Sequence, residues 1–135
     1  RIGLVLEWVE GMNLKAYANE CGLRWNLLPQ DGRVKDGGDP GPNHKRKLLM
    51  DVTSGMQFLH AQKPPIIHRD LKPANILVEM LATPPRAKIT DFGVSVLLES
   101  DDVQGKSGTK AYMAPEVVTG KQYNTSADVY SFGCT

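Results

Sequence analysis

The fold follows from one segment, Ile66-Ile67-His68-Arg69-Asp70-Leu71-Lys72-Pro73-Ala74-Asn75-Ile76-Leu77-Val78. Two apolar residues lead into a His-Arg-Asp turn, a lysine and an asparagine follow the aspartate at fixed offsets, and three apolar residues with β propensity end the segment. Asp91-Phe92-Gly93 begins 21 residues after Asp70, and Ala114-Pro115-Glu116 begins 23 residues after Asp91. Each tripeptide alone is a weak signal, but three motifs in this order and at these spacings are a strong one.

These motifs resemble the catalytic loop, the metal-binding motif and the end of the activation segment of eukaryotic protein kinases. The resemblance implies an α+β, protein-kinase-like fold of which residues 1–135 form an incomplete piece, mostly the helical large lobe. It implies that residues 1–13 are the last small-lobe strand and the hinge, and that residues 14–135 are part of the large lobe. The parent protein is then expected to be a serine/threonine kinase, similar to the tyrosine-kinase-like group of that branch.

The chemistry of phosphoryl transfer requires positioning and charge neutralisation more than covalent work, because its transition state is loose. The resemblance implies that Asp70 accepts the proton of a substrate hydroxyl and that Lys72 places a positive charge near the transferring phosphate. It implies that Asn75 and Asp91 supply oxygen ligands to Mg²⁺. The residues alone leave an alternative, in which His68, Asp70 and Asn75 are turn residues that satisfy local backbone groups.

The start of the chain is expected to bind ATP. Residues 2–9 form a β-like run, and a helix is expected from Leu14 to about Glu20. The resemblance assigns the nucleotide contacts to Leu6 as gatekeeper, Glu7 and Val9 through the hinge backbone, Asn13 near the ribose and Leu77 under the adenine ring. The alternatives are an edge strand followed by a turn for the hinge, and core burial for Leu77.

The middle of the chain is expected to contain an inserted loop and a core helix. Breaking residues gather between Asp36 and Pro42, so residues 21–42 are expected to form a surface loop. Trp25, Leu27 and Leu28 in this loop suit either a docking patch or a small packed turn. A helix is expected from an N-cap at Asn43 to His60, with a buried stripe formed by Leu48, Val52, Met56 and Leu59. A hairpin is expected between residues 76–78 and 87–90.

Residues 91–116 resemble an activation segment. Phe92 is expected to pack beside His68, and Gly93 to allow a turn. Arg69 is expected to pair with a phosphate added by an upstream kinase, and Ser107 is the first choice for the modified hydroxyl. The adjacent Asp101 and Asp102 could instead give Arg69 a permanent negative partner.

The last part of the chain resembles the substrate-positioning segment and the start of a central helix. Thr109 is expected to hydrogen-bond with Asp70 and Lys72. Glu116 is expected to pair with an arginine of a later helix, which would lie beyond Thr135, so that here it is solvated or its segment is loose. Asp128 is expected to brace the backbone of the His68–Arg69 turn, and the alternative is an acidic residue placed by the helix dipole.

Composition limits the remaining possibilities. The chain has 135 residues, is 41% hydrophobic and 23% charged, and carries a net charge of +1, so nothing favours nucleic acid as a partner. No apolar run reaches the length of a membrane span. Cys21 and Cys134 are isolated, which favours a cytoplasmic protein with free thiols, without disulfide or zinc.

Three classes of function compete on this evidence. The first is an active kinase whose partner is a protein substrate with serine or threonine. The second is a pseudokinase that acts as a binding or scaffold module, and the unseen strand lysine would discriminate it from the first. The third is a phosphotransferase for metabolites or lipids, which leaves the peptide-presenting segment from Gly108 to Glu116 without a purpose. Residues 1–135 alone are expected to bind nucleotide poorly.

Overall fold

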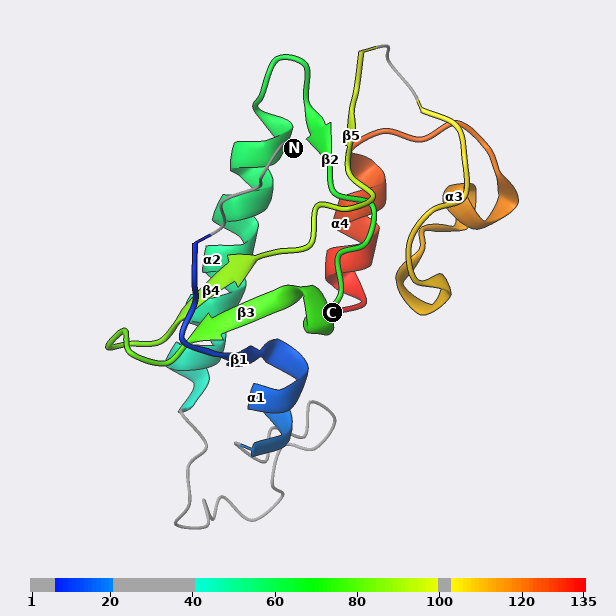
Figure 1. The fold of residues 1–135 in the computed structure, drawn as a ribbon. Helices are drawn as coiled ribbons and strands as arrows, with labels where there is room; N and C mark the ends of the chain where they lie inside the picture. Colours follow the sequence, from blue (N-terminus) through cyan, green and yellow to red (C-terminus); the bar gives the residue numbers. More distant parts are fainter. Residues whose placement is uncertain (1–6, 21–40, 100–102) are drawn as a thin grey trace, which may run out of the picture.

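The computed structural model describes residues 7–20, 41–99 and 103–135. In chain order the elements are β1 Gly11–Asn13, α1 Leu14–Glu20, α2 Gly41–His60, β2 Ile66–Ile67, η1 Pro73–Asn75, β3 Ile76–Glu79, β4 Arg86–Ile89, β5 Val96–Leu97, η2 Lys110–Tyr112, α3 Pro115–Thr119 and α4 Ser126–Gly133. The chain combines helices with short antiparallel strands, and the α+β class is confirmed (Figure 1).

Helix α2 supplies one wall of the larger core. Its buried residues recur every three or four positions and therefore lie on one face. They are Leu48, Val52, Met56 and Leu59, and the predicted stripe is confirmed. The first three pack with β3 and with Leu14 and Tyr17 of α1. Figure 1 shows the β3–β4 hairpin lying across α2, with α1 below it.

Two small sheets position the loops between them. Strands β1, β3 and β4 form an antiparallel sheet in that order, and β2 pairs with β5. In β3 the side chains of Ile76 and Val78 are buried in the core, so Leu77 points to the opposite face of the sheet. Leu77 is paired with Asn13 of β1 and with Lys88 of β4.

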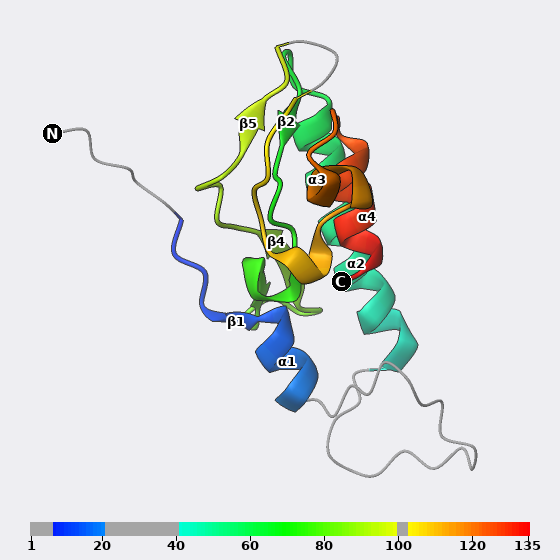
Figure 2. The same cartoon turned by 90° about the vertical axis from the view of Figure 1, so that its right-hand side faces the viewer.

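A second apolar cluster lies under the activation segment and helps to fix α3 and α4. It consists of Ile67, Ala114, Val117, Tyr123 and Ala127. Figure 2 shows α3 and α4 on the same side of the molecule as α2, with β5 and β2 on the other. A backbone bridge between Val103 and Tyr123 ties the activation segment to the loop before α4.

The prediction of a strand over residues 2–9 is wrong for its described part. Residues 7–9 form no strand, and the strand of this region is β1, Gly11–Asn13. The reason is pairing: Gly11, Met12 and Asn13 lie opposite β3, whereas residues 7–9 have no strand beside them in the described chain. Leu6 lies outside the described residues.

The predicted boundary between the inserted loop and α2 is also wrong. The helix begins at Gly41, so residues 41–42 belong to it and Asn43 lies inside its first turn. Pro42 fits there because the first turn of a helix needs no backbone N–H from it. The rest of the predicted loop, with Trp25, Leu27 and Leu28, lies outside the described residues. The hairpin is present, although β4 begins at Arg86 and ends at Ile89.

None of the helices in the three described ranges is both long enough and apolar enough to cross a bilayer.

Candidate active site

The loop between β2 and η1 is held by a buried carboxylate. Asp128, in the first turn of α4, is 1% exposed. Its Oδ2 accepts a hydrogen bond from the His68 amide at 2.8 Å, and its Oδ1 accepts one from the Arg69 amide at 2.9 Å. Arg69 has a φ of 69°, a conformation that side-chain-bearing residues rarely adopt. The predicted contact of Asp128 is therefore present, and it holds the loop in an unfavourable backbone conformation.

His60 completes this arrangement and was not foreseen from the sequence. It is the last residue of α2, and its Nε2 lies 2.9 Å from Asp128 Oδ2. Buried carboxylates need several hydrogen-bond partners. A histidine at a helix C-terminus has an ordinary explanation in the helix dipole, so the sequence carried no signal for this partner.

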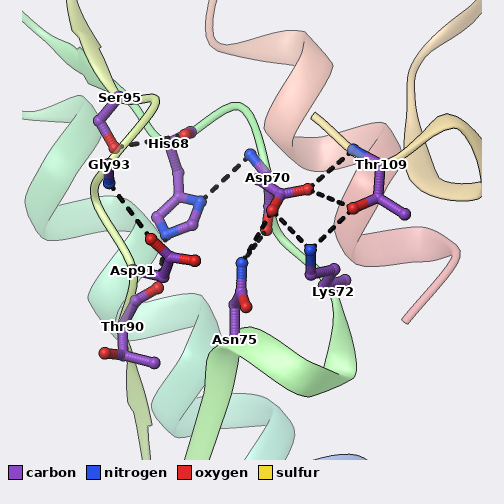
Figure 3. Close-up of polar contacts among 9 residues, drawn as sticks. All are labelled: His68, Asp70, Lys72, Asn75, Thr90, Asp91, Gly93, Ser95 and Thr109. Atoms are coloured by element: carbon purple, nitrogen blue, oxygen red, sulfur yellow. Dashed lines mark hydrogen bonds and ion pairs between the residues drawn. The ribbon is translucent and has the colours of Figure 1, made fainter. Parts of the chain in front are cut away.

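Asp70 lies at the centre of a polar cluster (Figure 3). Its Oδ1 accepts hydrogen bonds from the Thr109 amide at 2.8 Å and from Thr109 Oγ1 at 2.7 Å. Its Oδ2 accepts from Lys72 Nζ at 2.7 Å and from Asn75 Nδ2 at 3.0 Å. Lys72 Nζ also donates to Thr109 Oγ1 at 2.8 Å. The four predicted residues thus meet, although Thr109 is 39 positions from Asp70 in the sequence.

Gly108 allows Thr109 to come this close. Its φ is 112°, and a Cβ at this position would lie 2.3 Å from the carbonyl oxygen of Arg69. No side chain fits in that space, so glycine is required where the chain before Thr109 passes Arg69.

Opposing effects act on the pKa of the Asp70 carboxyl group. Burial raises its pKa, but the hydrogen bonds from Lys72 and Thr109 and the charge of Lys72 lower the pKa by more, so it lies below the ordinary value of 3.8. The side chain is therefore an oriented carboxylate at neutral pH, able to accept a hydrogen bond from a hydroxyl.

Replacing Lys72 by methionine is expected to raise the pKa of Asp70, because it removes the largest lowering contribution. A lowered pKa in the folded state stabilises the fold above the unfolded-state pKa, and this contribution is lost as pH falls through the folded-state value. As the pH is lowered, Lys72→Met should lose this stabilising contribution of Asp70 at a higher pH than the wild type does. Carboxyl carbon NMR of Asp70 measures the titration directly. Lys110→Met, at an exposed neighbour of Thr109, is the control, and an Asp70 titration that is the same in both variants would contradict the assignment.

The segment around Asp91 is shaped by a left-handed residue. Asp91 has a φ of 65°, and its exposed carboxylate accepts from the Gly93 amide at 3.4 Å. Gly93 lies in a turn closed by a hydrogen bond from the Ser95 amide to Phe92 O at 3.1 Å. The turn lies at Gly93, as the sequence predicts, but Asp91 carries the left-handed conformation, which the sequence did not predict and which aspartate tolerates better than most residues.

Phe92 and His68 make the predicted contact. Their ring centroids are 5.1 Å apart, with an angle of 65° between the rings, an edge-to-face arrangement. His68 is 1% exposed, and its Nε2 lies 2.9 Å from Thr90 O while its Nδ1 lies 3.3 Å from the Asp70 amide. The ring thus joins the backbone before Asp91 to the backbone of Asp70.

Asn75 and Asp91 have the chemistry to hold Mg²⁺. Asn75 is 6% exposed, and its Nδ2 donates to Asp70 O at 2.9 Å and to Asp70 Oδ2 at 3.0 Å. These bonds leave the amide oxygen of Asn75 and the exposed carboxylate of Asp91 as hard oxygen donors. The described ranges contain no cluster of three or more His, Cys, Asp or Glu side chains suited to a metal. The two donors of Asn75 and Asp91 therefore fit a cation that takes the rest of its ligands from phosphates and water.

Two of the predicted nucleotide residues, Asn13 and Leu77, fall on one face of the larger sheet. Asn13 and Leu77 are strand partners on this face, opposite the buried face of β3. Lys88 Nζ donates to Glu7 at 2.6 Å and to Glu79 at 3.4 Å. Its hydrogen bond with Glu7 is the main reason that the pKa of Lys88 is raised. Asn13 also caps α1, since its Oδ1 accepts from the Ala16 amide at 2.9 Å, a role that the sequence analysis missed. Val9 is half-buried.

The guanidinium group of Arg69 donates hydrogen bonds to uncharged groups of the chain. Its Nε donates to Val94 O, and its Nη1 donates to Tyr123 Oη at 3.4 Å. Arg69, Ser107, Tyr123 and Ser131 line one small cavity with the apolar side chains beneath the activation segment. The structure therefore brings Ser107 beside Arg69, while Asp101 and Asp102 lie outside the described residues.

Glu116 lies in the first turn of α3 and is half-buried. Among the ion pairs of the described residues, none involves Glu116. The expected arginine partner of Glu116 stays a prediction.

Comparison with known proteins gives the family. Residues 1–135 match the family model described as the protein kinase domain. The chain belongs to the protein kinase family. This kinase chain is 45% identical to the serine/threonine-protein kinase CTR1 of Arabidopsis thaliana, in a match that covers 73% of the chain and 12% of that protein.

Two further relatives show how far the likeness extends. The dual specificity protein kinase splA of Dictyostelium discoideum is 34% identical over 96% of the kinase chain and 5% of its own length. The probable serine/threonine-protein kinase WNK6 of Oryza sativa is 41% identical over 65% of the chain and 19% of its own length. The kinase chain thus spans a small part of these relatives. The resemblance and the kinase-like fold are confirmed.

Proposed function

We propose that the protein containing this chain is a serine/threonine protein kinase that transfers the γ-phosphate of ATP to hydroxyl groups of protein substrates. The observation that carries the proposal is the Asp70 carboxylate, which is fixed by Lys72, Asn75 and Thr109 at 2.7–3.0 Å. The family match and the names of the relatives support it.

The residues of the cluster divide the chemistry between them. Asp70 would hydrogen-bond with the acceptor hydroxyl, align it with the γ-phosphorus and take up its proton. As the new oxygen–phosphorus bond forms, the bond between the γ-phosphorus and the bridging oxygen breaks, and ADP leaves. Lys72 is placed to stabilise the negative charge of the transferring group. Asp91 and Asn75 would hold Mg²⁺, which neutralises phosphate charge when bound.

The nucleotide and domain assignments are part of the proposal. The face formed by Asn13 and Leu77 would receive the ribose and the adenine ring, with Glu7, Val9 and Leu6 in the hinge. Residues 1–13 would then be the last small-lobe strand and hinge, and residues 14–135 part of the large lobe. The ion pair between Lys88 and Glu7 supports a hinge held against the sheet.

A protein acceptor is favoured by the contact between Thr109 and Asp70. Thr109 joins the catalytic carboxylate to a segment that continues through η2 into α3. A small-molecule phosphotransferase has no need for such a segment beside its base. The acceptor residue is tested with the complete protein, ATP, Mg²⁺ and peptide pools that contain serine, threonine or tyrosine alone. We expect transfer to serine and threonine; transfer confined to tyrosine or to small molecules would contradict the proposal.

Ser107 is proposed as the hydroxyl through which an upstream kinase regulates the protein. A phosphate there would lie in the cavity that Arg69 also lines, and the guanidinium has donors beyond those used for Val94 and Tyr123. Ser107→Ala should lower the activity of protein purified from cells, and leave phosphatase-treated protein unchanged. The measurement is the peptide phosphorylation rate before and after phosphatase treatment. Equal rates of phosphorylated and dephosphorylated wild type would remove Ser107 from regulation.

A further inference from the structure

Ser131 makes a contact that catalysis by Asp70, Lys72 and Asn75 does not explain. It is 5% exposed and lies three residues after Asp128, on the same face of α4. Its Oγ lies 2.8 Å from the carbonyl oxygen of Tyr112 and 3.0 Å from that of Ala127. Tyr112 is the last residue of η2, the turn that follows Thr109.

The single hydroxyl proton of Ser131 is shared between these two carbonyl oxygens, and the oxygen of Tyr112 is the nearer. The contact with Ala127 is ordinary, whereas the contact with Tyr112 is not. A serine inside a helix often donates to the carbonyl four residues earlier. Ser54 does so in α2, where its Oγ lies 2.9 Å from Met50 O on an exposed face. Ser131 reaches a carbonyl of another segment, 19 residues away in sequence. The bond is partly buried, and a carbonyl shielded from water that loses its donor is costly, so this contact resists displacement of η2.

Helix α4 therefore holds both sides of the candidate site. Asp128 fixes the backbone of the loop that carries Asp70. One turn later, Ser131 fixes η2, and Thr109, the residue before η2, hydrogen-bonds to Asp70. Because the helix is rigid over one turn, the two contacts set the separation between the catalytic loop and the acceptor segment.

We propose that Ser131 is a positioning residue for the protein substrate, which acts by holding η2 at a fixed distance from Asp70. The inference rests on the proposed kinase function and adds a determinant of acceptor binding. The proposal predicts different effects on the KM for the peptide and the KM for ATP. Loss of the Ser131 hydroxyl disturbs the acceptor segment, while the sheet face that carries Asn13 and Leu77 is formed by other elements.

The test compares Ser131→Ala with Ser54→Ala in the complete protein. Both variants remove a helical serine hydroxyl bonded to the carbonyl four residues earlier, but only the first breaks a contact between segments. Ser131→Ala should raise the KM for a peptide substrate about tenfold and leave the KM for ATP within a factor of about two. Ser131→Thr should restore the peptide KM, because it keeps the hydroxyl and its methyl group can enter the adjoining cavity.

A second measurement is independent of activity. Lys110 is exposed in η2, so the rate of trypsin cleavage after Lys110 reports how firmly this turn is held. We expect faster cleavage in Ser131→Ala and wild-type rates in Ser54→Ala and Ser131→Thr. An inactive wild type would refute the proposed function while the cleavage rates still tested the Ser131 contact. Wild-type peptide KM and cleavage rates in Ser131→Ala, or equal increases in both KM values, would overturn the inference.

Discussion

Asp70→Asn is expected to lower turnover in the complete protein by roughly 10²–10⁴-fold while nucleotide binding is retained. The carboxylate accepts four hydrogen bonds, from Thr109, Lys72 and Asn75, and is also the proposed proton acceptor. An amide at this position has one oxygen, and its NH₂ group would face donors. The measurement is the rate of phosphate transfer at saturating ATP and peptide, with circular dichroism to verify folding.

Two comparisons make this result specific. Glu99→Gln removes one negative charge from an exposed side chain and should have the wild-type rate. Asp91→Asn should also lower turnover at saturating ATP, because Asp91 is assigned to the Mg²⁺ that would neutralise the charge of the transferring phosphate. Near-wild-type turnover in either Asp70→Asn or Asp91→Asn would refute the role given to that residue.

Asp128→Ala is expected to reduce the free energy of unfolding by roughly 2–5 kcal/mol. The substitution leaves the amides of His68 and Arg69 and the ring of His60 without their buried acceptor. It also frees Arg69 to leave its positive φ, which would displace Asp70. Urea unfolding of the complete protein measures the change.

His60→Ala serves as the control for this prediction. It removes one of the three partners of Asp128 at a partly exposed position and should cost about 1 kcal/mol. An Asp128→Ala variant as stable as wild type, or less damaging than His60→Ala, would show that the buried carboxylate does not hold the loop.

The sequence was most informative where its motifs match those of a known family. The motifs that contain Asp70, Lys72, Asn75 and Thr109 predicted that these residues meet, and the structure forms this cluster. The stripe of α2 was equally predictable, because a buried helix face must repeat with the helical period.

Other features depend on contacts that no local pattern records. The pairing of β2 with β5 involves strands of two residues, too short for an alternating pattern. His60 and Ser131 meet their partners only after α2, α4 and η2 have packed. Residues 7–9, the described part of the β-like run, had the right composition, but a strand needs a neighbour, and in the described chain the neighbour β3 lies beside Gly11–Asn13.

The most direct test of the central claim is single-turnover transfer of labelled γ-phosphate from ATP to a serine- and threonine-containing peptide pool by the complete protein with Mg²⁺. We predict transfer that is lost on chelation of Mg²⁺ and in Asp70→Asn, and retained in Glu99→Gln. Tight nucleotide binding without any transfer would contradict the account, and would identify the protein as a scaffold that keeps the kinase fold without its activity.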